Sequence, residues 1–292
     1  MSTTNDGTLE KLATLTVTET LGASEVAAAL GLSPWTSPWE LWARKTGRLT
    51  EPKESEALDA GVRLEPVVIK WAEQYLGPIQ RGVEAAIQGT PIVTHPDGLT
   101  RDGQPVEAKT SGVVGQIVGH WGEPGSDEIP EYYLVQCLVQ LEATKADVCH
   151  VPALLGGRGF VMYRVPSNRD VQQAIVERAV NWFEYHVIGD RPPELTTPPP
   201  LSVLKKLRRE PNKVVPLDLD LVDRWLLAKE RAREAQKEAD LLQAEVIAAL
   251  GDAEAGELPD GRTVTYYEQF RKGYVVEDTT FRVLRVTKGA RK

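Results

Sequence analysis

The stretch THPDGLTRDGQPVEAKTSG, residues 94–112, decides how the chain is interpreted. Its Pro-Asp-Gly and Asp-Gly steps are typical of turns, so the stretch is predicted to form a hairpin. If residues 104–110 form the second strand, Glu107 and Lys109 lie on one face of it, because side chains alternate with a period of two. Ala108 then faces the opposite, buried side of the sheet. A carboxylate and an ammonium are therefore expected side by side.

Asp97 lies at the end of the preceding strand, so the hairpin is expected to bring it beside Glu107. Two carboxylates, completed by water and phosphate oxygens, suit Mg²⁺ or Mn²⁺. Lys109 is placed to orient or help deprotonate an attacking water and to offset charge in a phosphoryl transition state. The alternative interpretation is an exposed Glu-x-Lys pair beside an ordinary Asp-Gly turn, and these three residues alone do not decide between the two.

Glu65 adds a third carboxylate. Apolar and small residues recur at helical spacing over residues 55–76, and Glu65 falls on that apolar face. A buried carboxylate needs a cation or a hydrogen bond. The partner is either the metal site or an arginine such as Arg63 or Arg81.

A helix is predicted over residues 130–144, with Tyr133, Gln136 and Gln140 on one face at i, i+3 and i+7. A phenol and two amides on one stripe suit contacts to phosphate or sugar. The alternative is a solvated polar face.

The order of predicted elements gives the fold class. Ser24 is expected to cap a short helix that ends at Gly31, and Ser37 with Pro38 begins a second. The remaining elements of the first 190 residues are a helix over 55–76, strands over 79–87, 91–95 and 104–110, a helix over 130–144, strands over 147–155 and 160–165, and a helix over 168–188. This order predicts an α/β domain, with a mixed central sheet flanked by helices.

A boundary is predicted at RPPELTTPPP, residues 191–200, because five prolines in ten residues make a stiff linker. It separates a domain of residues 1–190 from an extension of residues 201–292. The extension is predicted to hold a long helix with a heptad seam over residues 221–249, followed by a small β appendage that includes GRTVTYYEQF and FRVLRV.

Charge is distributed unevenly. Residues 1–190 contain 15 Lys and Arg against 25 Asp and Glu, a net of −10, and the rest contain 19 against 17, a net of +2. Two cysteines make no disulfide framework, and no apolar run reaches the ~18 residues of a membrane span. A cytoplasmic protein that does not enter a membrane is expected.

Six motifs together resemble a known family. They are GASEV (22–26), GLSPWTSPWELW (31–42), LEP (64–66), HPDGL (95–99), EAK (107–109) and YxxQ (133–136). They resemble the YqaJ-type viral recombinases, the lambda-exonuclease-like members of the PD-(D/E)xK nuclease superfamily, over about residues 20–187. The resemblance implies a Mg²⁺-dependent exonuclease, with Mn²⁺ able to substitute, that degrades the 5′ strand of duplex DNA ends and leaves 3′ single strands for phage recombination.

The resemblance also implies roles and partners. Asp97, Glu107 and the Ala108 carbonyl would hold metal, with Glu65 reaching it from its helix. Lys109 would serve the attacking water, Gln136 and Tyr133 would hold the site and the DNA strand, and Ser24 would lie near a terminal phosphate. A homo-oligomer and a single-strand annealing partner are expected from the same resemblance.

Two features depart from the family pattern. The Arg that meets the 5′-phosphate in lambda-exonuclease-like members has no counterpart in TLTVTET (residues 14–20), and His95 stands where some members have a smaller polar residue. An endonuclease on the same core, or a noncatalytic DNA-end-binding or assembly protein, are the alternatives. The cluster of Trp35, Trp39 and Trp42 is expected to pack in the core rather than to form a wedge that splits DNA ends.

Overall fold

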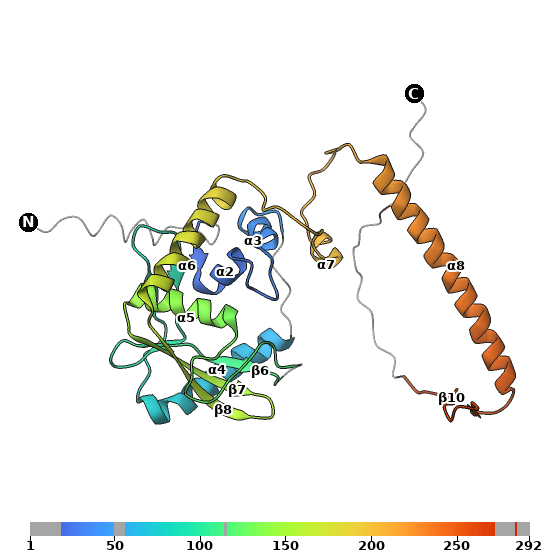
Figure 1. Cartoon of the computed structure of the whole chain (residues 1–292), viewed down its shortest axis with the longest axis horizontal. Coiled ribbons are helices and arrows are strands. Elements are labelled where there is room, and N and C mark those ends of the chain that lie inside the picture. The colour runs from blue at the N-terminus through green and yellow to red at the C-terminus, as the bar shows by residue number, and fades with distance from the viewer. Residues whose placement is uncertain (1–18, 50–55, 114–115, 272–283, 285–292) are drawn as a thin grey trace, which may run out of the picture. The chain divides into compact units, whose positions relative to one another are not determined.

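The computed structural model describes residues 19–49, 56–113, 116–271 and 284 (Figure 1). The chain divides into two compact units, residues 1–208 and 209–292, and each is described by itself. Among the described helices, none combines the length and apolar character needed to cross a membrane.

The first unit begins with a short strand and two helices, β1 (Leu21–Gly22), α2 (Ala23–Ala29) and α3 (Pro38–Lys45). The Ser37 side chain accepts from the Glu40 N–H at 3.2 Å and Pro38 occupies the first turn, as the sequence predicts.

The predicted Ser24 cap is wrong. Ser24 lies inside α2 and is exposed, and the cap residue is Gly22, whose N–H donates to Oε2 of Glu25 at 2.8 Å. The buried Lys45 ammonium lies 2.6 Å from the same oxygen. Glu25 therefore ties the start of α2 to the end of α3, and the placement of Ser24 near a terminal phosphate stays a prediction.

Two sheets form the centre of the unit. A small sheet has the order β1–β3–β2, with β2 at Ala85–Ala86 and β3 at Ile92–Thr94. The larger sheet is mixed and contains β4 (Gly98–Leu99), β5 (Pro105–Val106), β6 (Lys109–Ser111), β7 (Val148–Leu155) and β8 (Gly159–Pro166). In it β5 and β6 run parallel to β7, whereas β4 pairs antiparallel with β5 and β8 with β7.

Strands β5 and β6 are one strand with a short interruption. Val106 pairs with His150 and Lys109 pairs with Ala153, so the register along β7 is the same on both sides of residues 107–108. The Glu107 N–H still donates to the His150 carbonyl at 2.9 Å. The predicted strand over residues 104–110 therefore exists, with a gap in its pairing where the candidate site lies.

Helices cover both faces of the larger sheet. α4 (Glu56–Leu76) packs Ile69 and Ala72 against Val106, Ala108 and Met162. α5 (Glu131–Thr144) packs on the opposite face, against β7 and β8, and α2 and α6 (Arg169–Trp182) pack on α5 (Figure 1). α6 continues into a π-helical turn, Phe183–Ile188. The predicted mixed sheet flanked by helices is confirmed.

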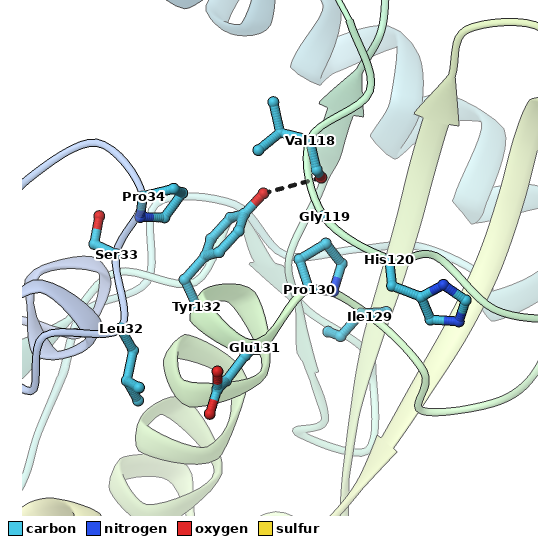
Figure 2. A pocket seen from close by; sticks show the side chains of 10 residues that line it. All are labelled: Leu32, Ser33, Pro34, Val118, Gly119, His120, Ile129, Pro130, Glu131 and Tyr132. Atoms are coloured by element: carbon cyan, nitrogen blue, oxygen red, sulfur yellow. Dashed lines mark hydrogen bonds between the residues drawn. The ribbon is translucent and has the colours of Figure 1, made fainter.

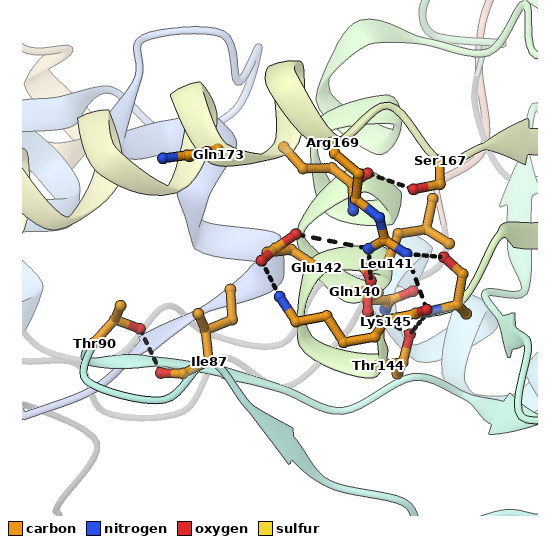
Figure 3. Close-up of polar contacts among 12 residues, drawn as sticks. Ile87, Thr90, Gln140, Leu141, Glu142, Thr144, Lys145, Ser167, Arg169 and Gln173 are labelled. Atoms are coloured by element: carbon orange, nitrogen blue, oxygen red, sulfur yellow. Dashed lines mark hydrogen bonds and ion pairs between the residues drawn. The ribbon is translucent and has the colours of Figure 1, made fainter.

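Arg169 fixes the end of α5. Its guanidinium donates to the carbonyls of Leu141, Lys145 and Ala146 and pairs with Glu142, which also pairs with Lys145 (Figure 3). A cation at a helix C-terminus satisfies carbonyls that have no partner within the helix and opposes the negative end of the helix dipole. Lys145 itself adopts the left-handed conformation, φ 58°, that ends the helix.

The structure divides the chain after Arg208 rather than after residue 190. Residues 191–200 contain no helix or strand, in keeping with their prolines, but α7 (Leu201–Leu204) packs back on the first unit. Val203 is buried with Trp42 and Leu49, and Leu207 pairs with Leu49 through the backbone. The proline-rich composition predicted a domain boundary at residues 191–200, whereas these tertiary contacts extend the first unit to residue 208.

The second unit contains α8 (Leu219–Leu250) and a hairpin of β9 (Ala255–Glu257) and β10 (Thr263–Thr265). The long helix and the β appendage are confirmed over these residues, and the helix ends at Gly251 as the sequence predicts. FRVLRV lies outside the described residues except for Leu284. No residue of α8 is buried, so the partner of its heptad seam stays a prediction.

Gly98 gives a test of the packing next to Asp97. A Cβ at this position would lie 2.2 Å from Cγ2 of Ile79 and 3.0 Å from the Gln80 carbonyl oxygen. We expect Gly98→Ala to lower the free energy of unfolding by about 1–3 kcal/mol, because the strand would have to move away from its neighbour. The measurement is urea unfolding of the purified variant.

Gly61→Ala is the matched control. Its Cβ would meet only Thr110 Oγ1, at 3.6 Å, and alanine is the better helix former by up to about 1 kcal/mol. We expect it to be as stable as the wild type or more so. Equal loss of stability in both variants would contradict the packing described here.

Candidate active site

The carboxylate of Glu107 is the centre of the candidate site. It follows β5, is 3% exposed, and accepts hydrogen bonds from three side chains. Oε1 accepts from Lys109 Nζ at 2.5 Å and from Gln136 Nε2 at 2.6 Å, and Oε2 accepts from Gln140 Nε2 at 2.5 Å. The predicted placement of Glu107 and Lys109 on one face is confirmed, and that face meets α5.

Gln136 and Gln140 are one helical turn apart on α5, so both amides reach the same carboxylate. Gln140 is fully buried, and its Oε1 accepts from Cys149 Sγ at 3.7 Å, which fixes which end of the amide faces Glu107. The amides thus hold Glu107 rather than forming a solvated polar face. The family resemblance gave Gln136 a role in holding the site, but no such role was predicted for Gln140. The signal for Gln140 was a second amide four residues along an otherwise apolar helix.

Asp97 is held by the backbone beside Glu107. Successive N–H groups of a strand point to opposite sides: that of Glu107 donates to β7, and that of Ala108 donates to Asp97 Oδ2 at 2.7 Å. Asp97 directly precedes β4, so its carboxylate accepts the next N–H where the β4–β5 ladder ends. This confirms the predicted neighbourhood of Asp97 and Glu107.

The electrostatics of Asp97 follow from this position. Burial raises the pKa of Asp97 to about 7, and the charge of Glu107 adds to the increase. Lys109 opposes it, while Glu65 contributes a smaller increase. Two neighbouring carboxylates out of water resist holding two negative charges unless a cation is present.

Lys109 completes the cluster. Burial alone would lower the pKa of Lys109, but Glu107, Tyr133 and Asp97 outweigh it and hold the pKa above its usual value. Nζ also donates to Gln136 Oε1 at 3.1 Å and lies 4.6 Å from the centroid of the Tyr133 ring. The side chain is a fixed cation with donors directed at the carboxylate, and it sits at the edge of an aromatic surface.

Glu65 takes the alternative partner that the sequence left open. It pairs with Arg81, and its side chain is 30% exposed rather than buried. It is nevertheless close enough to Asp97 to act on it electrostatically. Its role as a metal ligand stays a prediction.

The donor set fits a hard divalent cation of the Mg²⁺ type. Within the described residues no group of three or more His, Cys, Asp and Glu side chains converges on one point. Mg²⁺ does not need such a group, because it usually keeps several waters and is held by one or two carboxylates plus substrate phosphate oxygens. Asp97 and Glu107, with the Ala108 carbonyl between the two strand segments, are the residues that would hold it.

The sequence that carries this site is similar to those of known proteins. The model of the YqaJ-like viral recombinase domain matches residues 17–147, which include Asp97, Glu107, Lys109 and Gln136. That match covers somewhat less than half of the chain. The YqaJ protein of Bacillus subtilis strain 168, described as uncharacterized, is 27% identical over 249 residues, which cover 81% of this chain and 76% of that protein.

Solved structures also resemble this chain. An alkaline exonuclease from Laribacter hongkongensis aligns with a TM-score of 0.43 and 16% identity, over 64% of this chain and 94% of that one. A phage-related exonuclease from Haemophilus somnus 129PT aligns with a TM-score of 0.42 and 10% identity, over 59% and 96%.

A pocket of about 530 Å³ lies between the loop at residues 32–34 and the start of α5 (Figure 2). Tyr132 stands in its wall, and its hydroxyl donates to the Val118 carbonyl at 3.2 Å. The tryptophans near this loop differ from expectation. Trp42 is buried and Trp39 packs against it, but Trp35 is 57% exposed, so the prediction of core packing is wrong for Trp35.

Asp97 gives a pH-dependent prediction for the metal-free protein. Its pKa is higher folded than the ordinary 3.8, so an ionised Asp97 costs stability above pH 7, and the cost disappears as the pH falls from 7 towards 4. We expect Asp97→Asn to melt at a higher temperature than the wild type at pH 8 in EDTA. The difference should shrink to nothing near pH 4.

Exposed Asp102 supplies the control, since Asp102→Asn removes a carboxylate from the same hairpin without touching the cluster. The measurement is the melting temperature of both variants and of the wild type at several pH values between 4 and 8. A gain that is the same at every pH would mean that Asp97 is not destabilised by burial and by Glu107.

Proposed function

We propose that the protein is a Mg²⁺-dependent deoxyribonuclease, with Mn²⁺ able to substitute, that hydrolyses phosphodiesters from the ends of duplex DNA. One observation carries the proposal: Asp97, Glu107 and Lys109 are gathered on one side of the sheet, and Gln136 and Gln140 fix the geometry. The similarity of residues 17–147 to the YqaJ-like viral recombinase domain supports DNA as the substrate. Degradation of the 5′ strand, which would leave a 3′ overhang for an annealing protein, extends the proposal, as does a homo-oligomeric assembly.

The residues of the chain have separate tasks in this reaction. A divalent cation, when bound, supplies a Lewis acid for the phosphate oxygens. Lys109 is positioned to orient a water and to offset negative charge in the transition state. Gln136 and Gln140 keep Glu107 turned towards the site. The Tyr133 ring supports Lys109 from the side where the DNA strand would lie.

Asp97→Asn is the most direct test. It retains an oxygen for the Ala108 N–H and removes the negative charge that the cation needs, so we expect cleavage to fall by roughly 10²-fold or more with folding preserved. Glu84→Gln, an exposed carboxylate change on the neighbouring loop, should cut like the wild type. Glu107→Ala is less suitable, because it leaves the Lys109 ammonium and two buried amides without their acceptor.

The assay uses linear duplex labelled at either end, with and without Mg²⁺, beside a covalently closed circle. Loss of label from the 5′ end alone would support the proposed polarity. Cutting of the closed circle would show an endonuclease instead. Unchanged cleavage by Asp97→Asn would remove the basis of the proposed site.

Lys109→Met separates metal binding from catalysis. Lysine is not a ligand, and its removal takes a positive charge away from the carboxylates. We therefore expect Mn²⁺ affinity, measured by calorimetry, to be retained while cleavage is lost. A loss of Mn²⁺ affinity as large as that of Asp97→Asn would contradict the role given to Lys109.

A further inference from the structure

A second cavity adjoins the candidate active site. It has a volume of about 140 Å³, and one wall is β6 and the residue after it, residues 110–112, directly following Lys109. Three aromatic side chains, Trp35, Tyr132 and Tyr133, form another wall. The cavity is smaller than the roughly 300–1,000 Å³ that encloses a drug-sized ligand, so it suits one ring system rather than a whole nucleotide.

The three rings form a continuous surface that leads to the catalytic lysine. Trp35 meets Tyr132 edge-on, with ring centroids 4.5 Å apart, and lies 6.2 Å from Tyr133. Tyr132 is fixed by its hydrogen bond to the Val118 carbonyl (Figure 2). The Lys109 ammonium lies over the Tyr133 ring, 4.6 Å from its centroid. Trp35 is thus supported by a rigid neighbour while more than half of its surface remains open to solvent.

The chemistry of the lining selects a class of ligand. Of the described residues that line the cavity, none carries a charge, and the polar ones are Thr110, Ser111 and Gln116 besides the tyrosines. A phosphate would find no cation here. A flat, uncharged ring with hydrogen-bonding edges would find an indole to stack on and hydroxyl and amide groups at its edge. Nucleobases have these properties, and stacking on an aromatic side chain accepts any base sequence.

We propose that this cavity, with Trp35 as its stacking wall, binds the base of the nucleotide next to the phosphodiester that is cut. The inference rests on the proposed nuclease function and adds to it a base-binding subsite outside the Asp97, Glu107 and Lys109 cluster. Trp35 acts there as a positioning residue. Stacking holds the terminal nucleotide while the neighbouring phosphate lies at the carboxylates, so its effect falls on substrate binding more than on the chemical step.

The experiment compares the full-length wild type with Trp35→Ala and Trp35→Phe. The probe is a short duplex with 2-aminopurine at its 5′-terminal position, bound in Ca²⁺ in place of Mg²⁺, with a gel to confirm that the probe stays intact. The fluorescence of 2-aminopurine falls when the base stacks. Tyr185→Ala is the matched control, because Tyr185 is a similarly exposed aromatic residue, 54%, outside the cavity.

We expect the wild type and Tyr185→Ala to quench the probe, and Trp35→Ala to lose the quenching and to bind roughly 5- to 150-fold more weakly, the range for one base stacked on an aromatic ring. Trp35→Phe should retain most of the quenching and most of the binding affinity. In Mg²⁺, Trp35→Ala should raise KM more than it lowers kcat. Melting temperatures of all variants show whether folding is intact.

Two negative results have different meanings. If the wild type cuts duplex ends but Trp35→Ala quenches and cuts with wild-type KM, the base subsite is wrong and the nuclease function stands. If the wild type neither binds nor cuts duplex DNA, the proposed function fails and the subsite fails with it. A KM increase of the same size in Tyr185→Ala would also overturn the specific role of Trp35.

Discussion

The first unit depends on how one buried carboxylate is compensated. An ionised Glu107 out of water costs several kcal/mol unless its oxygens are paired, and removing a partner from such a group costs more than the pair contributes. Its three donors come from two elements, Lys109 on β6 and the two glutamines on α5. A helix that packs on a sheet through apolar contacts alone can slide or rotate at small cost. Two amides one turn apart, aimed at one carboxylate, set both the rotation and the axial position of α5.

The same arrangement leaves a second carboxylate in an unfavourable state. Asp97 is held by the Ala108 N–H where the β4–β5 ladder ends, so the backbone rather than a cation keeps it in place. Burial and the charge of Glu107 then raise its pKa to about 7. Lys109 is committed to Glu107 and compensates Asp97 only in part. The fold therefore places Asp97 where a divalent cation would remove a repulsion, which is a reason for a metal to bind there rather than at the many exposed acids of the chain.

Local rules predicted most of the elements and the face on which the acids lie. Ser37 with Pro38 set the start of α3, and the alternation of residues 106–109 placed Ala108 under α4 and Glu107 under α5. Where long-range contacts compete with local ones, the predictions failed. Glu25, paired with Lys45, replaced the expected Ser24 cap, and the contacts of Val203 extend the first unit past the prolines. For Glu65 the sequence left two partners open, and the structure pairs it with Arg81. Helical spacing says nothing of loop residues, so the exposure of Trp35 could not be predicted.

The acidic character of the first 190 residues, with a net charge of −10, bears on how such a domain could hold a polyanion. This net charge gives no long-range attraction for DNA, so on the proposed function the phosphate contacts near the site would come from a bound cation and from Lys109. The rest of the attraction for the strand would come from interactions between uncharged groups. The aromatic surface from Tyr133 through Tyr132 to Trp35 is of this kind, and it begins at the lysine itself. On the proposed function, stacking is independent of sequence and nearly independent of charge, so it would let an acidic protein engage a strand at the point of cleavage without binding the rest of the duplex tightly. An exonuclease of the proposed kind, which releases each nucleotide before taking the next, would gain from such a division, since tight phosphate contacts along the duplex would slow that release.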